Sequence, residues 1–540
     1  MSAATVTPAD LASLLASPAP HALLDVRERG AYERGHIYRA TSLPRRLIEF
    51  RLPGLVTAPA TPIVLCDEDQ AVADLAATTV AAMGYRDVRV LAGGLAAWRA
   101  AGRPTVQGLN VQSKVFGERM LHEMRTPQIR PADLQARMAA GADMVIVDTR
   151  TPEEYSRGCI PGAFSLPGGE AVLRIADLVA RPDQTIVVHC GGRTRSYIGA
   201  ESLRRMKLPN PVVALENGTM GWQLAGLELE RGAARWAPPP SERSRALAEP
   251  VAARVASEEG IPFVSPDELR ALLARREDRT VHVLDVRSAE EYTAEHIAGA
   301  VWAPGGQAVQ ATDEYVAVRA AAVVLACDGM VRSVMTASWL RRMGLPGVAV
   351  LRGGLPAWRA AGGAIETGPL PISVWGEDAA RAGVRALTPD AVAAALQDTD
   401  APTVLSVDPS DLYARGHLPG ARWVCRSRLE LRIAALAPDR GHAIVLTCAD
   451  GVSSTLAAAT LGRLGYGRVA VLEGGIRAWE RAGLALETGP TGLADEVDDV
   501  VLKPYERGRA AMEAYLRWEE ELDLEGRSPH ALLPDAGGRR

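Results

Sequence analysis

The segment 186–196 reads Ile-Val-Val-His-Cys-Gly-Gly-Arg-Thr-Arg-Ser, an apolar run that ends at a cysteine and enters a loop of glycine and arginine. Three further apolar runs end at a cysteine in the same way, at 63–66, 323–327 and 444–448. Because each repeat must fold as one unit, the chain is predicted to contain four similar domains. A tryptophan signature, Gly-Gly-x-x-x-Trp or Asn-Gly-x-x-x-Trp, closes each repeat 31 or 32 residues beyond the cysteine: 66 to 98, 190 to 222, 327 to 358 and 448 to 479.

The fold class follows from the alternation of short apolar runs with helical stretches. Continuous apolar runs of four or five residues, bounded by turn residues, are typical of strands buried on both faces of a parallel sheet. Strands that alternate with helices predict α/β layers with right-handed crossovers. The expected opening strands are 23–25, 145–148, 283–285 and 405–408, the helices include 71–83, 197–206 and 455–464, and the closing strands are 88–91, 212–215, 348–351 and 469–472.

The spacing of the repeats predicts a duplicated two-domain unit. The first and third repeats are offset by 260 or 261 residues (98 to 358, 66 to 327), and the second and fourth by 257 or 258 (222 to 479, 190 to 448). We interpret 238–260, which is Pro-rich and charged, as a semi-rigid spacer between the halves rather than a packed element. The predicted domains are 1–106, 125–232, 258–368 and 384–489, followed by a helical acidic tail over 490–540.

The tail is expected to form one acidic amphipathic helix over 505–524. Two placements remain open for this helix. It packs back onto the last domain, which is the simpler interpretation, or it docks a partner protein.

Composition excludes several classes of function. The net charge is −5 and the pI about 6.1, so neither nucleic acid nor a membrane surface is an expected partner. No apolar run reaches the length of about 18 residues that a membrane span needs, and 1–15 lacks the features of an export signal. Six cysteines without a CxxC motif indicate reduced cytoplasmic thiols and give no support to zinc or thioredoxin chemistry. No metal or organic cofactor is expected.

Several ordered motifs around these cysteines resemble the rhodanese-like sulfurtransferase family. Asp-x-Arg appears at 25–27, 148–150 and 285–287, and is followed by a Glu-Tyr or Gly-His-Ile segment, the cysteine loop and the tryptophan signature. The fourth repeat has Asp408 but lacks the arginine. The resemblance covers about 8–490. We expect the Asp-x-Arg elements to form structural ion pairs and His36, His296 and His417 to hold turns.

The resemblance implies a cysteine that attacks a sulfur donor as a thiolate and then carries the sulfur as a persulfide. The second loop fits this chemistry best, with Cys190 as the predicted nucleophile. Backbone N–H groups and a helix N-terminus stabilise such a thiolate. The remaining loop residues have predicted roles as well: Gly191 and Gly192 form a tight turn, Arg193 and Arg195 bind the anionic donor, and Ser196 caps the helix or contacts the persulfide.

The other three loops depart from this pattern to different degrees. Cys327 keeps an arginine at the same spacing, Arg332, but its neighbour Asp328 opposes thiolate formation. Cys448 lies in a loop without arginine that resembles those of mercaptopyruvate sulfurtransferases. We expect catalytic roles for Cys327 and Cys448, with Arg332 binding substrate. Cys66 is followed by three acidic side chains within four residues, and we interpret it as inert.

The expected activity is transfer of a sulfane sulfur from thiosulfate, or a donor such as 3-mercaptopyruvate, to cyanide, a thiol or a sulfur-carrier protein. A Cdc25-like phosphatase or arsenate reductase is disfavoured, because that loop runs Cys-x5-Arg and Arg195 lies only five residues after Cys190. The alternative from another class is a non-catalytic scaffold whose repeats bind partner proteins.

Overall fold

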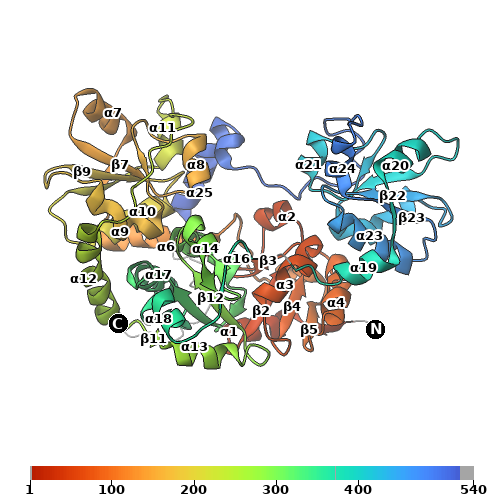
Figure 1. Cartoon of the computed structure of the whole chain (residues 1–540), viewed down its shortest axis with the longest axis horizontal. Coiled ribbons are helices and arrows are strands. Elements are labelled where there is room, and N and C mark those ends of the chain that lie inside the picture. Colours follow the sequence, from red (N-terminus) through yellow and green to blue (C-terminus); the bar gives the residue numbers. More distant parts are fainter. Residues whose placement is uncertain (1–2, 371–372, 523–540) are drawn as a thin grey trace.

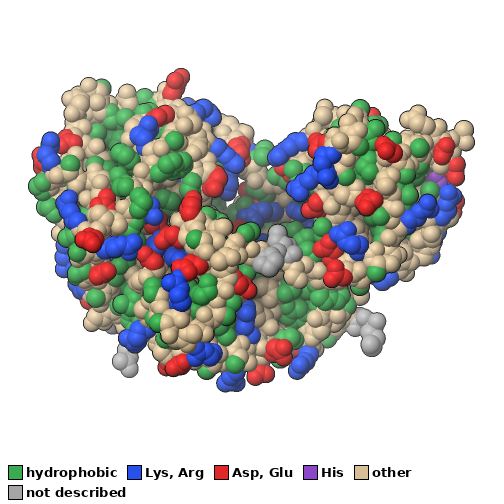
Figure 2. All heavy atoms as spheres, viewed as in Figure 1, with side chains coloured by type: hydrophobic (Ala, Val, Ile, Leu, Met, Phe, Trp, Pro, Cys, Tyr) green, Lys and Arg blue, Asp and Glu red, His purple; other side chains and the backbone are tan. Residues whose placement is uncertain are grey.

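The computed structural model describes residues 3–370 and 373–522, which form four α/β domains and a C-terminal segment. Figure 1 shows the second domain and the fourth domain as two lobes above the first and third domains. The space-filling view shows a hollow between these lobes (Figure 2). Within the described residues, no helix combines the length and the apolar character needed to cross a membrane.

The first domain contains a parallel sheet in the order β1-β5-β4-β2, with β3 also beside β2. A short strand of the third domain, β15 (Val318–Arg319), pairs with β2 in the antiparallel sense. The elements of this domain are β1 (Ala4–Val6), α1 (Pro8–Ala16), β2 (His21–Asp25), α2 (Arg29–Arg34), β3 (Thr41–Ser42), η1 (Arg45–Leu47), α3 (Ile48–Leu55), β4 (Ile63–Cys66), α4 (Ala71–Ala82), β5 (Val88–Leu91) and α5 (Gly94–Ala100).

The second domain follows a helix, α6, that packs along α10. Its parallel sheet has the order β6-β10-β9-β7-β8. The elements are α6 (Val111–Met124), β6 (Gln128–Ile129), α7 (Pro131–Ala139), β7 (Met144–Asp148), α8 (Pro152–Arg157), β8 (Phe164–Ser165), η2 (Gly168–Glu170), α9 (Ala171–Arg174), η3 (Ile175–Asp177), β9 (Thr185–His189), α10 (Thr194–Arg204), β10 (Val212–Leu215) and α11 (Gly218–Leu224).

The third domain repeats this order, with the parallel sheet β11-β17-β16-β12-β14 and a separate antiparallel pair, β13 with β18. Its elements are α12 (Glu242–Glu258), β11 (Phe263–Val264), α13 (Pro266–Leu273), β12 (Val281–Asp285), α14 (Ala289–Ala294), β13 (His296–Ile297), β14 (Val301–Trp302), α15 (Gly305–Gln310), α16 (Thr312–Tyr315), β15 (Val318–Arg319), β16 (Ala322–Ala326), α17 (Val331–Arg342), β17 (Val348–Leu351), α18 (Gly354–Ala360) and β18 (Ile365–Glu366).

The fourth domain has the parallel sheet β19-β23-β22-β20-β21. The predicted fold class is therefore confirmed in all four repeats. The elements of this domain and the tail are α19 (Glu377–Gly383), β19 (Arg385–Leu387), α20 (Pro389–Ala395), β20 (Thr403–Ser406), α21 (Ser410–Arg415), β21 (Arg422–Trp423), η4 (Arg426–Arg428), α22 (Leu429–Leu436), β22 (Ile444–Thr447), α23 (Val452–Arg463), β23 (Val469–Leu472), α24 (Gly475–Arg481), η5 (Pro504–Glu506) and α25 (Arg509–Glu521).

The predicted spacer over 238–260 is wrong, because most of it forms the 17-residue helix α12. Several of its charged residues are exposed, but Ala248, Val251, Ala252 and Val255 form an apolar stripe at i, i+3, i+4 and i+7. This stripe joins one hydrophobic core that runs from the second domain into the third. The charge-rich composition of the segment concealed its amphipathic periodicity.

The second domain packs against the third, and the first packs against the fourth. Both contacts use the equivalent segment of each repeat. Pro-Gly-Gly at 167–169 in the second domain faces Pro-Gly-Gly at 304–306 in the third. A Cβ on Gly169 would lie 2.9 Å from Gly305 Cα, so only glycine permits this approach. The equivalent segments of the first and fourth domains exchange ion pairs instead, Arg45 with Glu430 and Arg426 with Glu49.

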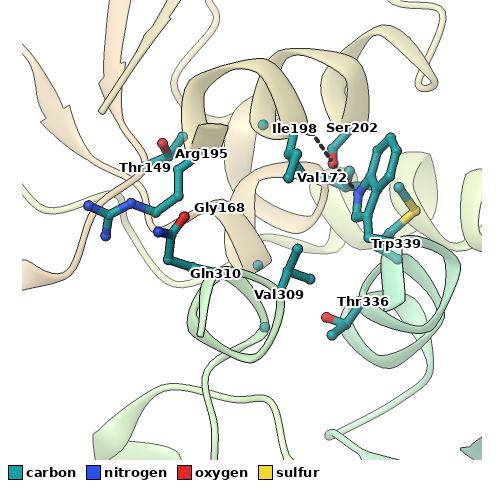
Figure 3. A pocket seen from close by; sticks show the side chains of 15 residues that line it. Thr149, Gly168, Val172, Arg195, Ile198, Ser202, Val309, Gln310, Thr336 and Trp339 are labelled. Atoms are coloured by element: carbon teal, nitrogen blue, oxygen red, sulfur yellow. Dashed lines mark hydrogen bonds between the residues drawn. The ribbon is translucent and has the colours of Figure 1, made fainter. Parts of the chain in front are cut away.

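The interface between the second and third domains is closely packed. Ile198 and Val172 of the second domain lie opposite Val309 of the third, around a cavity of only about 30 Å³ (Figure 3). The Trp339 indole N–H donates a hydrogen bond of 2.9 Å to Ser202 Oγ across the interface. This volume is close to that of a single water molecule. Little empty space therefore separates the two domains, which are in direct contact around the cavity.

The C-terminal helix does not pack onto the last domain, contrary to the simpler sequence interpretation. The chain crosses from the fourth domain to the second, where α25 lies against α6 and α11 (Figure 1). Met512 and Leu516 pack on Met220, beside the second cysteine loop. The predicted helix over 505–524 is thus shorter, and its last two positions lie outside the described residues.

We predict that Gly169→Ala destabilises the chain by about 1–3 kcal/mol, because the added methyl group forces the two backbones apart. Denaturant midpoints of the full-length variant and the wild type would measure the change. Gly462→Ala in α23 is the matched control, since no atom lies within 4 Å of a Cβ placed there. Equal midpoints for Gly169→Ala and the wild type would contradict the proposed steric role.

Candidate active site

Cys190 lies at the carboxyl end of β9, immediately before the loop that leads into α10. Its side chain is 2% exposed. The thiol donates a hydrogen bond of 3.5 Å to Ser196 Oγ, and the Ser196 hydroxyl donates to Arg193 O at 2.7 Å. The fold therefore places the predicted nucleophile and Ser196 in direct contact.

The carbonyl groups of the second loop are held by the N-terminus of α11. Thr219 N–H donates to Cys190 O at 2.8 Å, and Met220 N–H donates to Gly191 O at 3.0 Å. Gly192 lies close to the neighbouring helices, since a Cβ there would lie 2.9 Å from Met220 Cε and 3.0 Å from Glu519 Oε2. Gly192 thus lies where α11 and the C-terminal helix approach the loop, whereas a Cβ on Gly191 would meet only Arg150 Cδ, at 3.8 Å.

Arg193 is buried and its guanidinium is shared between several acceptors. It forms a two-point ion pair with Glu118 of α6, with both N–O distances at 2.7 Å. It also contacts Asn217 Oδ1 and Glu520 Oε1, each at 2.8 Å. These contacts tie α6, α11 and α25 to the loop, so Arg193 sets the geometry around Cys190.

Arg195 faces the border between the second and third domains. It pairs with Glu154 at 2.7 and 2.9 Å, and reaches Gln307 Oε1 of the third domain at 3.3 Å. Figure 3 shows its side chain between Thr149 and Gln310. Burial opposes ionisation of Glu154, but the charges of Arg195 and Arg150 outweigh it and lower the pKa of this carboxyl group.

A cavity of about 710 Å³ opens above Cys190. Its walls come from the second loop, from α2 of the first domain, from Gln310 of the third domain and from the C-terminal segment 501–518. Seven Lys or Arg side chains and two Glu side chains line it. The cavity is therefore suited to an anionic ligand.

The third loop places Arg332 in the position equivalent to Arg195, but its surroundings are more acidic. Arg332 contacts Glu291 and Asp328 of its own domain and Glu170 of the second domain, at 2.6 to 2.8 Å. Burial raises the pKa of Cys327, and Asp328 raises it further, whereas Arg332 and Ser333 act in the opposite direction. Three carboxylates therefore occupy the guanidinium that was predicted to bind substrate.

The fourth loop surrounds its sulfur with backbone donors. Gly451 N–H and Ser454 N–H point to Cys448 Sγ at 3.2 and 3.3 Å. Burial nevertheless raises the pKa of Cys448, and the neighbouring Asp408 adds to the effect. Asp408 lacks the arginine partner that its equivalents have, and burial raises its own pKa to about 6.

The first loop contains no basic residue, and Asp67 uses its carboxylate locally. It accepts the backbone N–H groups of Gln70, Val72 and Ala73, which fixes the start of α4. Burial and the charge of Asp25 raise the pKa of Cys66 well above its ordinary value, although Arg27 opposes this. These contacts agree with the interpretation of Cys66 as inert.

The expected structural roles of the recurring motifs are confirmed. Arg27, Arg150 and Arg287 each pair with the aspartate two residues earlier, at 2.6 to 2.7 Å. His36, His296 and His417 each contact a tyrosine carbonyl four residues earlier through Nδ1, at 2.8 to 3.0 Å. Within 3–370 and 373–522, no group of His, Cys, Asp or Glu side chains is arranged to hold a metal ion.

Sequence reasoning missed the groups that reach the second loop from outside its own domain repeat. Glu118 and Lys114 belong to α6, and Glu519 belongs to α25. One signal was present, since Val-Phe-Gly-Glu at 115–118 reappears as Val-Trp-Gly-Glu at 374–377. That repeat marked the segment as part of the duplication without indicating that its glutamate would bind Arg193.

In each of the four α/β domains a cysteine lies at the carboxyl end of a parallel strand and is followed by a loop and a helix. A model described as the Rhodanese-like domain matches residues 7–101, 130–225, 265–361 and 388–482. The chain therefore belongs to the rhodanese-like family, as the sequence motifs predicted.

The proteins to which this chain is similar include sulfurtransferases and a regulator. The crystal structure of a thiosulfate sulfurtransferase from Pseudomonas aeruginosa matches with a TM-score of 0.89 and 38% identity, over 97% of this chain and 98% of that one. A thiosulfate sulfurtransferase of Azotobacter vinelandii is 30% identical over 240 residues, 37% of this chain and 87% of the relative. An HTH-type transcriptional regulator of Mycobacterium tuberculosis is 36% identical over 106 residues, which span only 45% of that protein and 19% of this chain.

We predict that Asp408→Asn lowers the pKa of Cys448, because it removes a negative charge while an amide oxygen can still accept the Ala449 N–H. The rate of alkylation of Cys448 by iodoacetamide at pH 8 should rise about threefold to tenfold. Peptide mass spectrometry at timed intervals would measure the rate. The exposed Asp398→Asn serves as the control, and equal rates in the two variants would refute the role of Asp408.

Proposed function

We propose that this protein is a sulfurtransferase that carries a sulfane sulfur from thiosulfate on Cys190. The single observation that supports this most strongly is the position of Cys190 at the base of a cavity with an excess of Lys and Arg side chains. The thiosulfate sulfurtransferase of known structure supports the same assignment, because it matches nearly the full length of both chains.

The reaction consists of two displacements at sulfur. The Cys190 thiolate attacks the outer sulfur of thiosulfate, and the bond between the two donor sulfurs breaks, so that sulfite leaves with the electron pair. Cyanide or a thiolate then attacks the outer sulfur of the persulfide, takes it as thiocyanate or a new persulfide, and restores the Cys190 thiolate. No net oxidation of the enzyme occurs.

The residues around Cys190 have distinct roles in this proposal. Ser196 contacts the sulfur directly, and in this proposal its hydroxyl turns from Arg193 O to donate to the sulfur once the thiol has lost its proton. Arg195 provides positive charge for the donor, while Arg193 positions the loop through Glu118. Gly191 and Gly192 keep the space above the sulfur free of side chains.

We propose different roles in sulfur transfer for the cysteines of the third and fourth loops. Cys448 has backbone donors but no arginine, which favours a donor of lower charge such as 3-mercaptopyruvate. Cys327 stands beside an arginine whose contacts are occupied by three carboxylates, so we propose that it contributes little to thiosulfate turnover.

Incubation with thiosulfate followed by intact-mass analysis tests the proposed function. We expect the full-length chain to gain the mass of one sulfur atom and to lose it when cyanide is added, whereas Cys190→Ser should gain none. Cys159→Ser is the matched control, because Cys159 is buried outside the loops. A chain that takes up no sulfur from thiosulfate or 3-mercaptopyruvate would instead support the scaffold function.

The contact between Arg195 and Gln307 generates a second prediction. Gln307→Glu would give Arg195 a second carboxylate, as Glu170 does for Arg332. We expect the KM for thiosulfate to rise about threefold to tenfold, and the effect to shrink as salt is added.

Steady-state thiocyanate formation would measure this change in KM. The control is Gln397→Glu, which adds the same charge at an exposed position of the fourth domain. If Gln307→Glu and Gln397→Glu gave the same KM, the third domain would have no influence on the charge at the second loop.

A further inference from the structure

The cavity above Cys190 is lined by seven cationic side chains, and six of them already have an acidic partner. The paired residues come from the first domain, from the second domain and from the C-terminal segment. Their ion pairs are Arg29 with Glu314, Arg34 with Glu496, Lys114 with Glu519, Arg193 with Glu118 and Glu520, Arg195 with Glu154, and Arg507 with Glu33.

Lys503 is the seventh cation, and no carboxylate oxygen of the described residues lies within ion-pair distance of its ammonium group. Lys503 has an exposed side chain on the cavity wall, although its neighbours desolvate the ammonium group enough to lower its pKa. Glu154 opposes the shift, whereas the charges of Arg195, Arg29 and Lys114 add to it. A bound anion would relieve this repulsion, and it would supply the partner that Lys503 lacks.

The C-terminal segment is firmly docked at this place. Glu519 is fully buried, and its carboxylate lies 2.8 Å from Lys114 Nζ and accepts the Thr194 hydroxyl at 3.3 Å. Trp518 covers Gly108 so closely that a Cβ on Gly108 would lie 2.4 Å from the indole ring. The position of Lys503 is therefore set by an element that lies outside the four rhodanese-like domains.

The apolar face of α25 is not free for a partner protein. Met512 and Leu516 are buried against Met220, and Trp518 packs with Val111 and Val115. The acidic face also contacts the second domain, because Glu520 pairs with Arg193. The helix thus completes a site within its own chain.

We infer that Lys503 binds the oxyanion end of the sulfur donor, so that the C-terminal segment is part of the substrate site. This inference rests on the proposed function. The donor would lie with its sulfonate oxygens between Lys503 and Arg195 and with its outer sulfur toward Cys190. Lys503, which follows the fourth domain in the chain, would then help to set the affinity for the donor at Cys190 of the second domain.

Calorimetric titration of thiosulfate into the full-length Cys190→Ser variant tests the inference without sulfur transfer. Adding Lys503→Gln should weaken the affinity about tenfold, since one charge-assisted contact is lost. Lys503→Arg, which keeps the charge, should remain within about threefold. Arg509→Gln is the matched control in the same tail, because Arg509 is 64% exposed and pairs only along its own helix with Glu513.

Each outcome of this titration supports or overturns the role of Lys503. Equal affinity with and without Lys503→Gln, or no measurable binding in either case, would overturn it. If Arg509→Gln weakened the affinity by the same factor as Lys503→Gln, the role would also be overturned, because the loss would then result from a disturbed docking of the tail. The proposed function fails separately, if the wild-type chain binds thiosulfate but never gains a sulfur atom on Cys190.

Discussion

The close approach of two backbones, at Gly169 and Gly305, is the constraint on which the geometry of the second loop depends. It brings α15 of the third domain against η2 of the second, and so places Gln307 beside Arg195. The same contact places Glu170 beside Arg332. Any side chain at the glycine positions would separate these partners, so a steric requirement in the interface controls the electrostatics of two cysteine loops.

The four loops share one backbone plan and differ in how their charges are balanced. Arg195 contacts one carboxylate, whereas Arg332 contacts three. Asp408 has no arginine at all. In an interior of low dielectric, these differences change the ionisation of a nearby thiol far more than they would in water. The four repeats therefore share one fold but surround their cysteines with different charges.

The sequence predicted the fold well because its signals are local. Apolar runs, the Asp-x-Arg pairs and the tryptophan signatures all act within one repeat, so each could be interpreted without knowledge of the others. The contacts of Arg193 could not be predicted, since Glu118 lies 75 residues away and Glu520 lies 327 residues away. The helix over Glu242–Glu258 was missed for a different reason, because its apolar stripe consists of small alanine and valine side chains between charged residues.

The site around Cys190 has parts that a single domain could not supply. Without α25, Met220 would lose its buried neighbours Met512 and Leu516, and Lys114 would lose the buried carboxylate of Glu519. A buried lysine without an ionic partner costs more free energy than a buried ion pair. This cost would favour a rearrangement of α6, and Glu118 would move with the helix. Arg193 would then lack its strongest contact and the loop its fixed geometry. The arrangement around Cys190 thus depends on the assembled chain, and the plan that the four repeats share explains only the placement of the cysteine.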